Sequence, residues 1–89
     1  MTIRDILKAI TEDKKVSITN LPVDANGEII TDSNAHEELY FKANKFVYKK
    51  YDNALQAIMD APEDILNQTI YTMSNYDEFI ALDYKVVCA

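Results

Sequence analysis

The chain has 89 residues, of which 48% are hydrophobic, and its fifteen acids against nine bases give a formal net charge of −6. This length makes one domain over residues 1–89, and the hydrophobic content excludes intrinsic disorder. The negative charge disfavours direct binding to nucleic acid and to anionic membranes, because both require a basic surface. No window approaches the roughly 20 apolar residues of a transmembrane helix, and the charged N-terminus is unlike a signal peptide. We therefore expect a cytoplasmic protein.

The first dozen residues predict an N-terminal helix. Thr2 is a suitable N-cap, and Asp5, three residues later, completes a capping box. The helix is expected to end near Glu12. Its apolar residues recur at helical spacing and form one stripe: Ile3, Ile6, Leu7 and Ile10.

Two short strands are expected to follow. Residues 15–19 alternate between polar and β-branched apolar side chains, which indicates a strand that ends at Asn20. Asn26-Gly27 is a strong turn signal, and residues 28–31 can form the second strand. The simplest interpretation is a loose antiparallel hairpin over residues 15–31.

A long central helix is predicted over residues 35–60. Asn34 and Glu37 have the spacing of a reciprocal cap, and neither glycine nor proline interrupts the segment. An alternative has a strand at residues 39–42 before a shorter helix, because aromatic residues also suit a pleated surface. The apolar stripe that favours the long helix consists of Tyr40, Val47, Tyr51, Ala54, Leu55 and Ile58.

The C-terminal third predicts a helix start and then a strand. Pro62 followed by two acids is typical of a first helical turn, whereas residues 65–73 fit either a helix or a strand. Residues 74–77 have turn chemistry, so we expect a C-terminal strand or hairpin. The final strand is marked by strict alternation of Ile80, Leu82, Tyr84 and Val86. The predicted class is α+β: an N-terminal helix, short antiparallel strands, one long central helix and this C-terminal strand or hairpin.

Residues that could perform catalysis or bind a metal are sparse. His36 and Cys88 are the only histidine and cysteine, and they lie about fifty residues apart, unlike the clustered ligands of a metal site. One glycine cannot make a phosphate-binding loop, and no serine lies in a nucleophile motif. We expect no enzymatic activity, no catalytic residues, no metal and no cofactor.

The charges are distributed unevenly. Two segments without lysine or arginine, residues 16–41 and 51–84, enclose a basic stretch of Lys42, Lys45, Lys49 and Lys50. Each acidic block is either the solvated side of its element or an interface for a basic partner, with tyrosines as anchors. The candidate partner-binding residues are Asp24, Glu28, Asp32, Glu37, Glu38, Glu63, Asp64, Tyr71, Tyr76, Asp77 and Glu78.

The opening helix from Met1 to Ile10, followed by the strand around Val16 and Ile18, resembles small phage-encoded proteins of Gram-positive bacteria, among them acidic anti-CRISPR proteins. The resemblance covers about the first twenty residues, together with size and charge. It implies an inhibitor in the host cytoplasm that binds a host protein with a basic nucleic-acid-binding surface, with nucleic-acid mimicry as one route. The alternative function is a self-associating structural or accessory domain, a homodimer without an inhibitory role.

Overall fold

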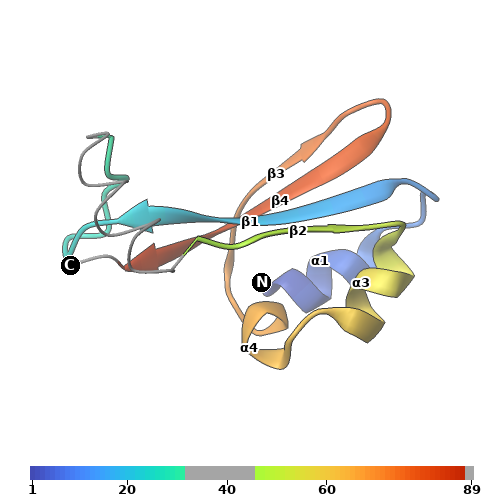
Figure 1. Ribbon diagram of the computed structural model, residues 1–89, viewed down its shortest axis with the longest axis horizontal. Coiled ribbons are helices and arrows are strands. Elements are labelled where there is room, and N and C mark those ends of the chain that lie inside the picture. The colour runs from blue at the N-terminus through green and yellow to red at the C-terminus, as the bar shows by residue number, and fades with distance from the viewer. Residues whose placement is uncertain (32–45, 88–89) are drawn as a thin grey trace.

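Three helices lie on one side of a four-stranded sheet (Figure 1). The computed structural model describes residues 1–31 and 46–87, and the fold is described for these residues alone. The strands lie in the order β2-β1-β4-β3. In chain order the elements are α1 (Ile3–Ala9), β1 (Lys15–Val23), β2 (Tyr48–Tyr51), α3 (Ala54–Asp60), α4 (Glu63–Leu66), β3 (Ile70–Asn75) and β4 (Phe79–Val87).

The two central strands, β1 and β4, are parallel. They pair along their whole length, from Lys15 opposite Phe79 to Val23 opposite Val87. The outer pairs, β1 with β2 and β3 with β4, are antiparallel. Parallel neighbours cannot be joined by a tight turn, so the chain between β1 and β4 has to cross over the sheet. The crossover carries α3 and α4, which lie on the same face of the sheet as α1 (Figure 1).

The core lies between this sheet face and the helices. Burying each isoleucine or leucine there contributes about 1.5–3 kcal/mol relative to an exposed position. Small alanines on α3, Ala54 and Ala57, let that helix approach the core closely. The largest core side chains from the strands are Val16, Ile18, Ile80 and Leu82, and those from the helices are Ile3, Leu7 and Leu66.

The predicted N-terminal helix and its N-cap are confirmed, but the helix ends at Ala9 and not near Glu12. The Thr2 hydroxyl accepts a hydrogen bond from the Asp5 amide at 3.2 Å, and the Thr2 amide donates to the Asp5 carboxylate at 3.1 Å. The bond from the Thr2 backbone, followed by the bond from its side chain, holds the pKa of Asp5 below its ordinary value of 3.8. The capping box is thus strongest with Asp5 ionised.

The long central helix is wrong for the described part of its range. Residues 48–51 form the edge strand β2, and the helix occupies only Ala54–Asp60. Asn53 starts it as an N-cap: its side-chain oxygen accepts a hydrogen bond from the Gln56 amide at 2.8 Å. The apolar stripe predicted a helix here because Tyr51, which points inward from the strand, happens to fall at helical spacing from the apolar residues of α3. Residues 35–45, including the alternative strand at 39–42, lie outside the described residues.

The predicted first strand extends further than expected, and its hairpin partner is wrong. β1 continues through Pro22 to Val23, and its antiparallel neighbour is β2. Pro22 is tolerated at this position in the strand. Its carbonyl accepts a hydrogen bond from the Ile30 amide and points away from β4, and the N–H of a strand residue points to the same side as its carbonyl. The N–H that proline lacks would therefore not have bonded to β4. Of the expected second strand, Ile29 forms a single bridge with Val23. The Asn26-Gly27 turn is confirmed, with Gly27 at φ 83°.

The C-terminal region follows the prediction closely. A short helix starts at Glu63, directly after Pro62. The undecided segment 65–73 divides: its first two residues finish α4, and the chain from Ile70 onward is strand β3. β3 and β4 form the expected antiparallel hairpin. The class α+β holds, but the short antiparallel strands are corrected to a mixed sheet with a nine-residue parallel pair at its centre.

Leu82 and Met73 provide a matched test of the core, because they face each other on β4 and β3 but are 0% and 46% exposed. We expect Leu82→Ala to lower the free energy of unfolding by about 2–5 kcal/mol, since it leaves a cavity under the helices. Met73→Ala should cost about 0.5 kcal/mol or less. Urea unfolding followed by circular dichroism measures both, and equal losses would contradict the burial of Leu82 in the core and the exposure of Met73 beside it.

Tyr84 predicts an alkaline loss of stability. Burial, with a smaller effect of Asp64, raises its pKa above the ordinary value of 10.0. Because the folded-state pKa exceeds the unfolded one, this contribution is complete below pH 10 and is lost as the pH rises through the folded-state pKa. The urea midpoint should therefore fall more steeply above pH 10 in the wild type than in Tyr84→Phe. Tyr76→Phe, at an exposed position, is the control and should follow the wild type.

Candidate binding surface on the open face of the sheet

The sheet face opposite the helices is named here the open face. Directly paired residues of neighbouring strands point to the same side of a sheet, so the register defines which side chains lie there. No helix of the described residues covers them (Figure 1). One row across the sheet consists of Lys50, Ser17, Ala81 and Ser74, and the next consists of Tyr48, Thr19, Asp83 and Thr72.

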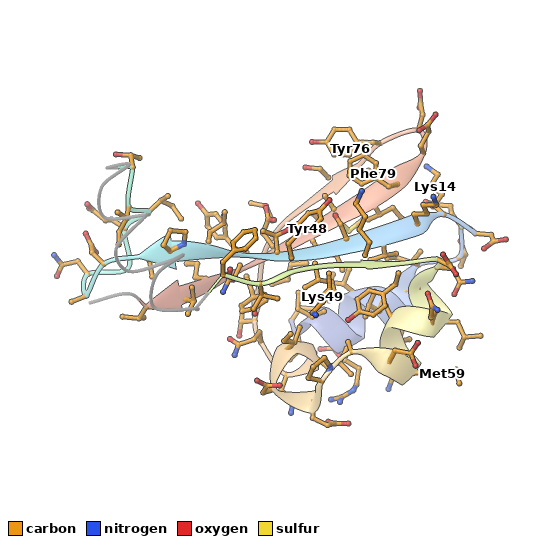
Figure 2. All side chains as sticks on the ribbon, in the orientation of Figure 1. Lys14, Tyr48, Lys49, Met59, Tyr76 and Phe79 are labelled. Carbon is orange, nitrogen blue, oxygen red and sulfur yellow. The ribbon has the colours of Figure 1, made fainter. Side chains whose placement is uncertain are left out.

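Exposed aromatic side chains stand on both sides of the open face. Tyr48 on β2 is 48% exposed and stacks against Phe46, with ring centroids 6.5 Å apart and rings almost parallel. Phe79 at the start of β4 is 38% exposed and stacks on Tyr76 at 4.8 Å. Figure 2 shows Tyr48, Tyr76 and Phe79 on the side away from the helices, whereas Met59 lies on the helix side. Large apolar rings that stay this accessible are typical of contact surfaces.

Between these aromatic groups the open face is hollowed. The small, buried side chain of Ser17 on β1 forms its floor, between the larger residues of β2 and Phe79 of β4. The hollow has a volume of about 280 Å³, just below the range of pockets that hold drug-sized ligands. It can accept a side chain or a small group and is too small for a large cofactor. Its lining residues are Lys15, Val16, Ser17, Tyr48, Lys50, Glu78 and Phe79.

The open face has a charge balance unlike that of the whole chain. Of the seven bases in the described residues, Lys15, Lys50 and Lys85 lie on it. Its one acid within the strands is Asp83, whose carboxylate accepts a hydrogen bond from the Thr72 hydroxyl at 2.6 Å. A chain of net charge −6 therefore has strands that present three lysines and one acid on their open face, together with aromatic rings.

The hairpin tip is the part of the predicted acidic set that reaches this surface. Tyr76, Asp77 and Glu78 connect β3 to β4, and Glu78 lines the hollow. Lys14 holds the tip in place: its ammonium donates to the Asn75 side chain and to the Tyr76 carbonyl, each at 2.9 Å. Two aromatic rings and two carboxylates are thereby presented together at one end of the open face.

The other described members of the set lie elsewhere. Asp24 and Glu28 belong to the turn after β1, about 30 Å from the hairpin tip by the length of a nine-residue strand. Asp24 has a structural role there, since its carboxylate accepts from the amides of Asn26 and Glu28.

Two more acids belong to the helix layer, and one tyrosine lies on an edge strand. Glu63 on α4 pairs with Arg4 of α1, and Asp64 is exposed beside it. Tyr71 lies on β3 with the Lys85 ammonium 4.4 Å from its ring centre. The acids of the candidate set that lie within the described residues thus form three separate groups and not one continuous array. Asp32, Glu37 and Glu38 lie outside the described residues.

Sequence reasoning missed the residues around the hollow. Tyr48 and Lys50 fall within the predicted helix over residues 35–60. In the structure Lys49 and Lys50 lie on opposite faces of β2. The signal for β1 was present, because placing Val16 and Ile18 inward puts Lys15 and Ser17 on the other side.

The described residues contain no group of three or more histidine, cysteine, aspartate or glutamate side chains placed to hold a metal ion. None of the helices within residues 1–31 and 46–87 is long and apolar enough to cross a lipid bilayer. Comparison of the chain with protein-family models, with curated proteins and with solved structures found no match.

Proposed function

We propose that this domain acts by binding another protein and thereby inhibits or modulates it. The observation that carries the proposal is the cluster of exposed aromatic rings around the hollow on the open face, next to the acids of the hairpin tip. Aromatic side chains in such positions provide most of the binding energy at protein interfaces. Tyr48, Tyr76 and Phe79 are the anchors of the proposed contact.

The partner class that charge supports is a host protein that handles nucleic acid. A net charge of −6 accelerates encounter with a basic surface, and the effect weakens as salt is added. The resemblance of the N-terminal helix and strand to acidic phage proteins supports the same partner class, and it favours action in the host cytoplasm. Because the described acids are dispersed, their charge supports steering toward the partner more directly than imitation of a continuous phosphate array.

The test is capture of partners from a host lysate by the tagged full chain and by two variants. We expect the double variant Tyr48→Ala, Tyr76→Ala to retain less than about a tenth of the captured partner, since it removes two anchors. Leu55→Ala is the matched control: Leu55 is 66% exposed but lies on α3, on the opposite side of the molecule, and should bind like the wild type. Circular dichroism checks that all three proteins are folded.

The partner class is tested by competition with nucleic acid. The captured protein should bind DNA or RNA, and adding this domain should lower that binding more strongly at low salt than at high salt. The proposal fails if capture is the same for the double variant and the wild type. The nucleic-acid part alone fails if the captured protein keeps its nucleic-acid occupancy in the presence of saturating domain.

Self-association stays the alternative function. The apolar stripe of the predicted long helix would have been its dimer surface, but residues 46–53 do not form a helix. The exposed pair Leu55 and Met59, one turn apart on α3, is the apolar surface it would use in its place. Light scattering over a hundredfold concentration range decides between partner binding and self-association. We expect a constant monomer mass for the wild type, and a concentration-dependent dimer that Met59→Asp abolishes would favour the alternative.

A further inference from the structure

We propose that the hollow on the open face binds an extended, acidic segment of the partner protein, with one carboxylate held between Lys15 and Lys50 and an apolar side chain against Tyr48. This inference rests on the proposed function, because it names the chemistry that the contact surface recognises. It goes beyond that function by assigning the site a ligand whose charge is opposite to the one expected from the acidic chain as a whole.

The two lysines of the hollow are available for an anionic ligand. The salt bridges among the described residues are Arg4 with Glu63 and Lys14 with Glu12, so neither Lys15 nor Lys50 has a carboxylate partner there. The Lys50 ammonium lies 5.7 Å from the ring centre of Tyr48. A carboxylate that binds the Lys50 ammonium therefore also lies near an exposed aromatic ring. Cation and ring together form a site for a side chain that is charged at one end and apolar along its length.

The spacing of the open face matches an extended peptide. Lys50 and Tyr48 stand in adjacent rows, two residues apart on β2, which is about 7 Å. Side chains two residues apart on an extended peptide have the same separation and also point to one side. A segment with an acid, any residue and then an apolar residue can therefore place its acid at the lysines and its apolar side chain beside Tyr48.

The volume of the hollow favours side chains over a larger ligand. About 280 Å³ holds a side chain or two and leaves no room for a bound dinucleotide or other large cofactor. Ser17 forms the floor and is only 5% exposed, so the hollow ends at this residue and a ligand cannot reach further into the protein.

Charge also separates this ligand from a nucleic-acid strand. Binding a strand neutralises several phosphates in a row, and the open face has three lysines, set against Asp83 and Glu78, on a chain of net charge −6. The lining of the hollow has two lysines, Lys15 and Lys50, against one acid, Glu78, and this formal net charge of +1 matches one carboxylate. A second copy is disfavoured as the occupant because each copy has the same net charge of −6, and repulsion between like charges opposes their association.

The experiment is an NMR titration of the isotope-labelled full chain with a synthetic peptide. Every second residue of this peptide is serine, and the residues between the serines are alternately glutamate and phenylalanine. The control peptide has glutamine in place of each glutamate. We expect the acidic peptide to shift the amide signals of Ser17, Tyr48, Lys50 and Phe79, and the glutamine peptide to bind at least about tenfold more weakly. Lys50→Glu should weaken the acidic peptide by a similar factor. Lys8→Glu, the same charge change on α1, should have an effect of less than about twofold.

Two further outcomes would overturn the inference. Equal affinity for the acidic and glutamine peptides would show that charge is not recognised, and preferential binding of a ten-residue oligothymidylate would assign the face to nucleic acid. Signals at the hollow that shift with protein concentration, without any peptide, would assign it to a second copy. The outcome is separable from that of the proposed function: if Lys50→Glu still captures the partner while the Tyr48→Ala, Tyr76→Ala variant does not, the partner contact stands and the acidic ligand is wrong.

Discussion

The parallel pairing of β1 with β4 is the constraint on which the remaining structure depends. Within residues 1–31 and 46–87, these strands are the only pair that meets along nine residues, and their inward side chains, Val16, Ile18, Ile80 and Leu82, are completely buried. Once they are adjacent, β2 and β3 can only occupy the outer edges. The long return that parallel strands require brings α3 and α4 onto the side of the sheet where α1 already packs.

Placing all the described helices on one side gives the domain two different surfaces. The helix side carries Glu63, Asp64 and the exposed apolar pair on α3, whereas the open face carries lysines and aromatic rings around the small side chain of Ser17. Acids that contribute to long-range attraction on the helix side are thus separated from the residues of the open face that would contact the partner. An acidic chain can approach a basic protein and still bind it through a surface with little net charge, which allows affinity and encounter rate to be tuned by different residues.

Features determined by neighbouring residues could be predicted from the sequence, and those determined by distant pairing could not. The Thr2–Asp5 cap, the Asn26-Gly27 turn and the alternation from Ile80 to Val86 each depend on a few adjacent side chains. The parallel pairing joins strands that lie far apart in the sequence, so no local pattern reveals it. The prediction for residues 48–51 failed for a second reason: four residues are too few to distinguish the period of a strand from that of a helix, and the apolar stripe of the neighbouring residues favoured the helix. The hollow depended on that same segment and was missed with it.

The position of β4 in the middle of the sheet also has a consequence for synthesis of the chain. β1 is made early, yet its full-length neighbour consists of residues 79–87, so the apolar side of β1 has no sheet partner along most of its length while the intervening residues are being translated. Among the described elements, α1 and, later, β2 and α3 can cover part of it. Completion of the core therefore waits for residues 79–87, and until then β1 is an incompletely paired strand that chaperones or other nascent chains can bind.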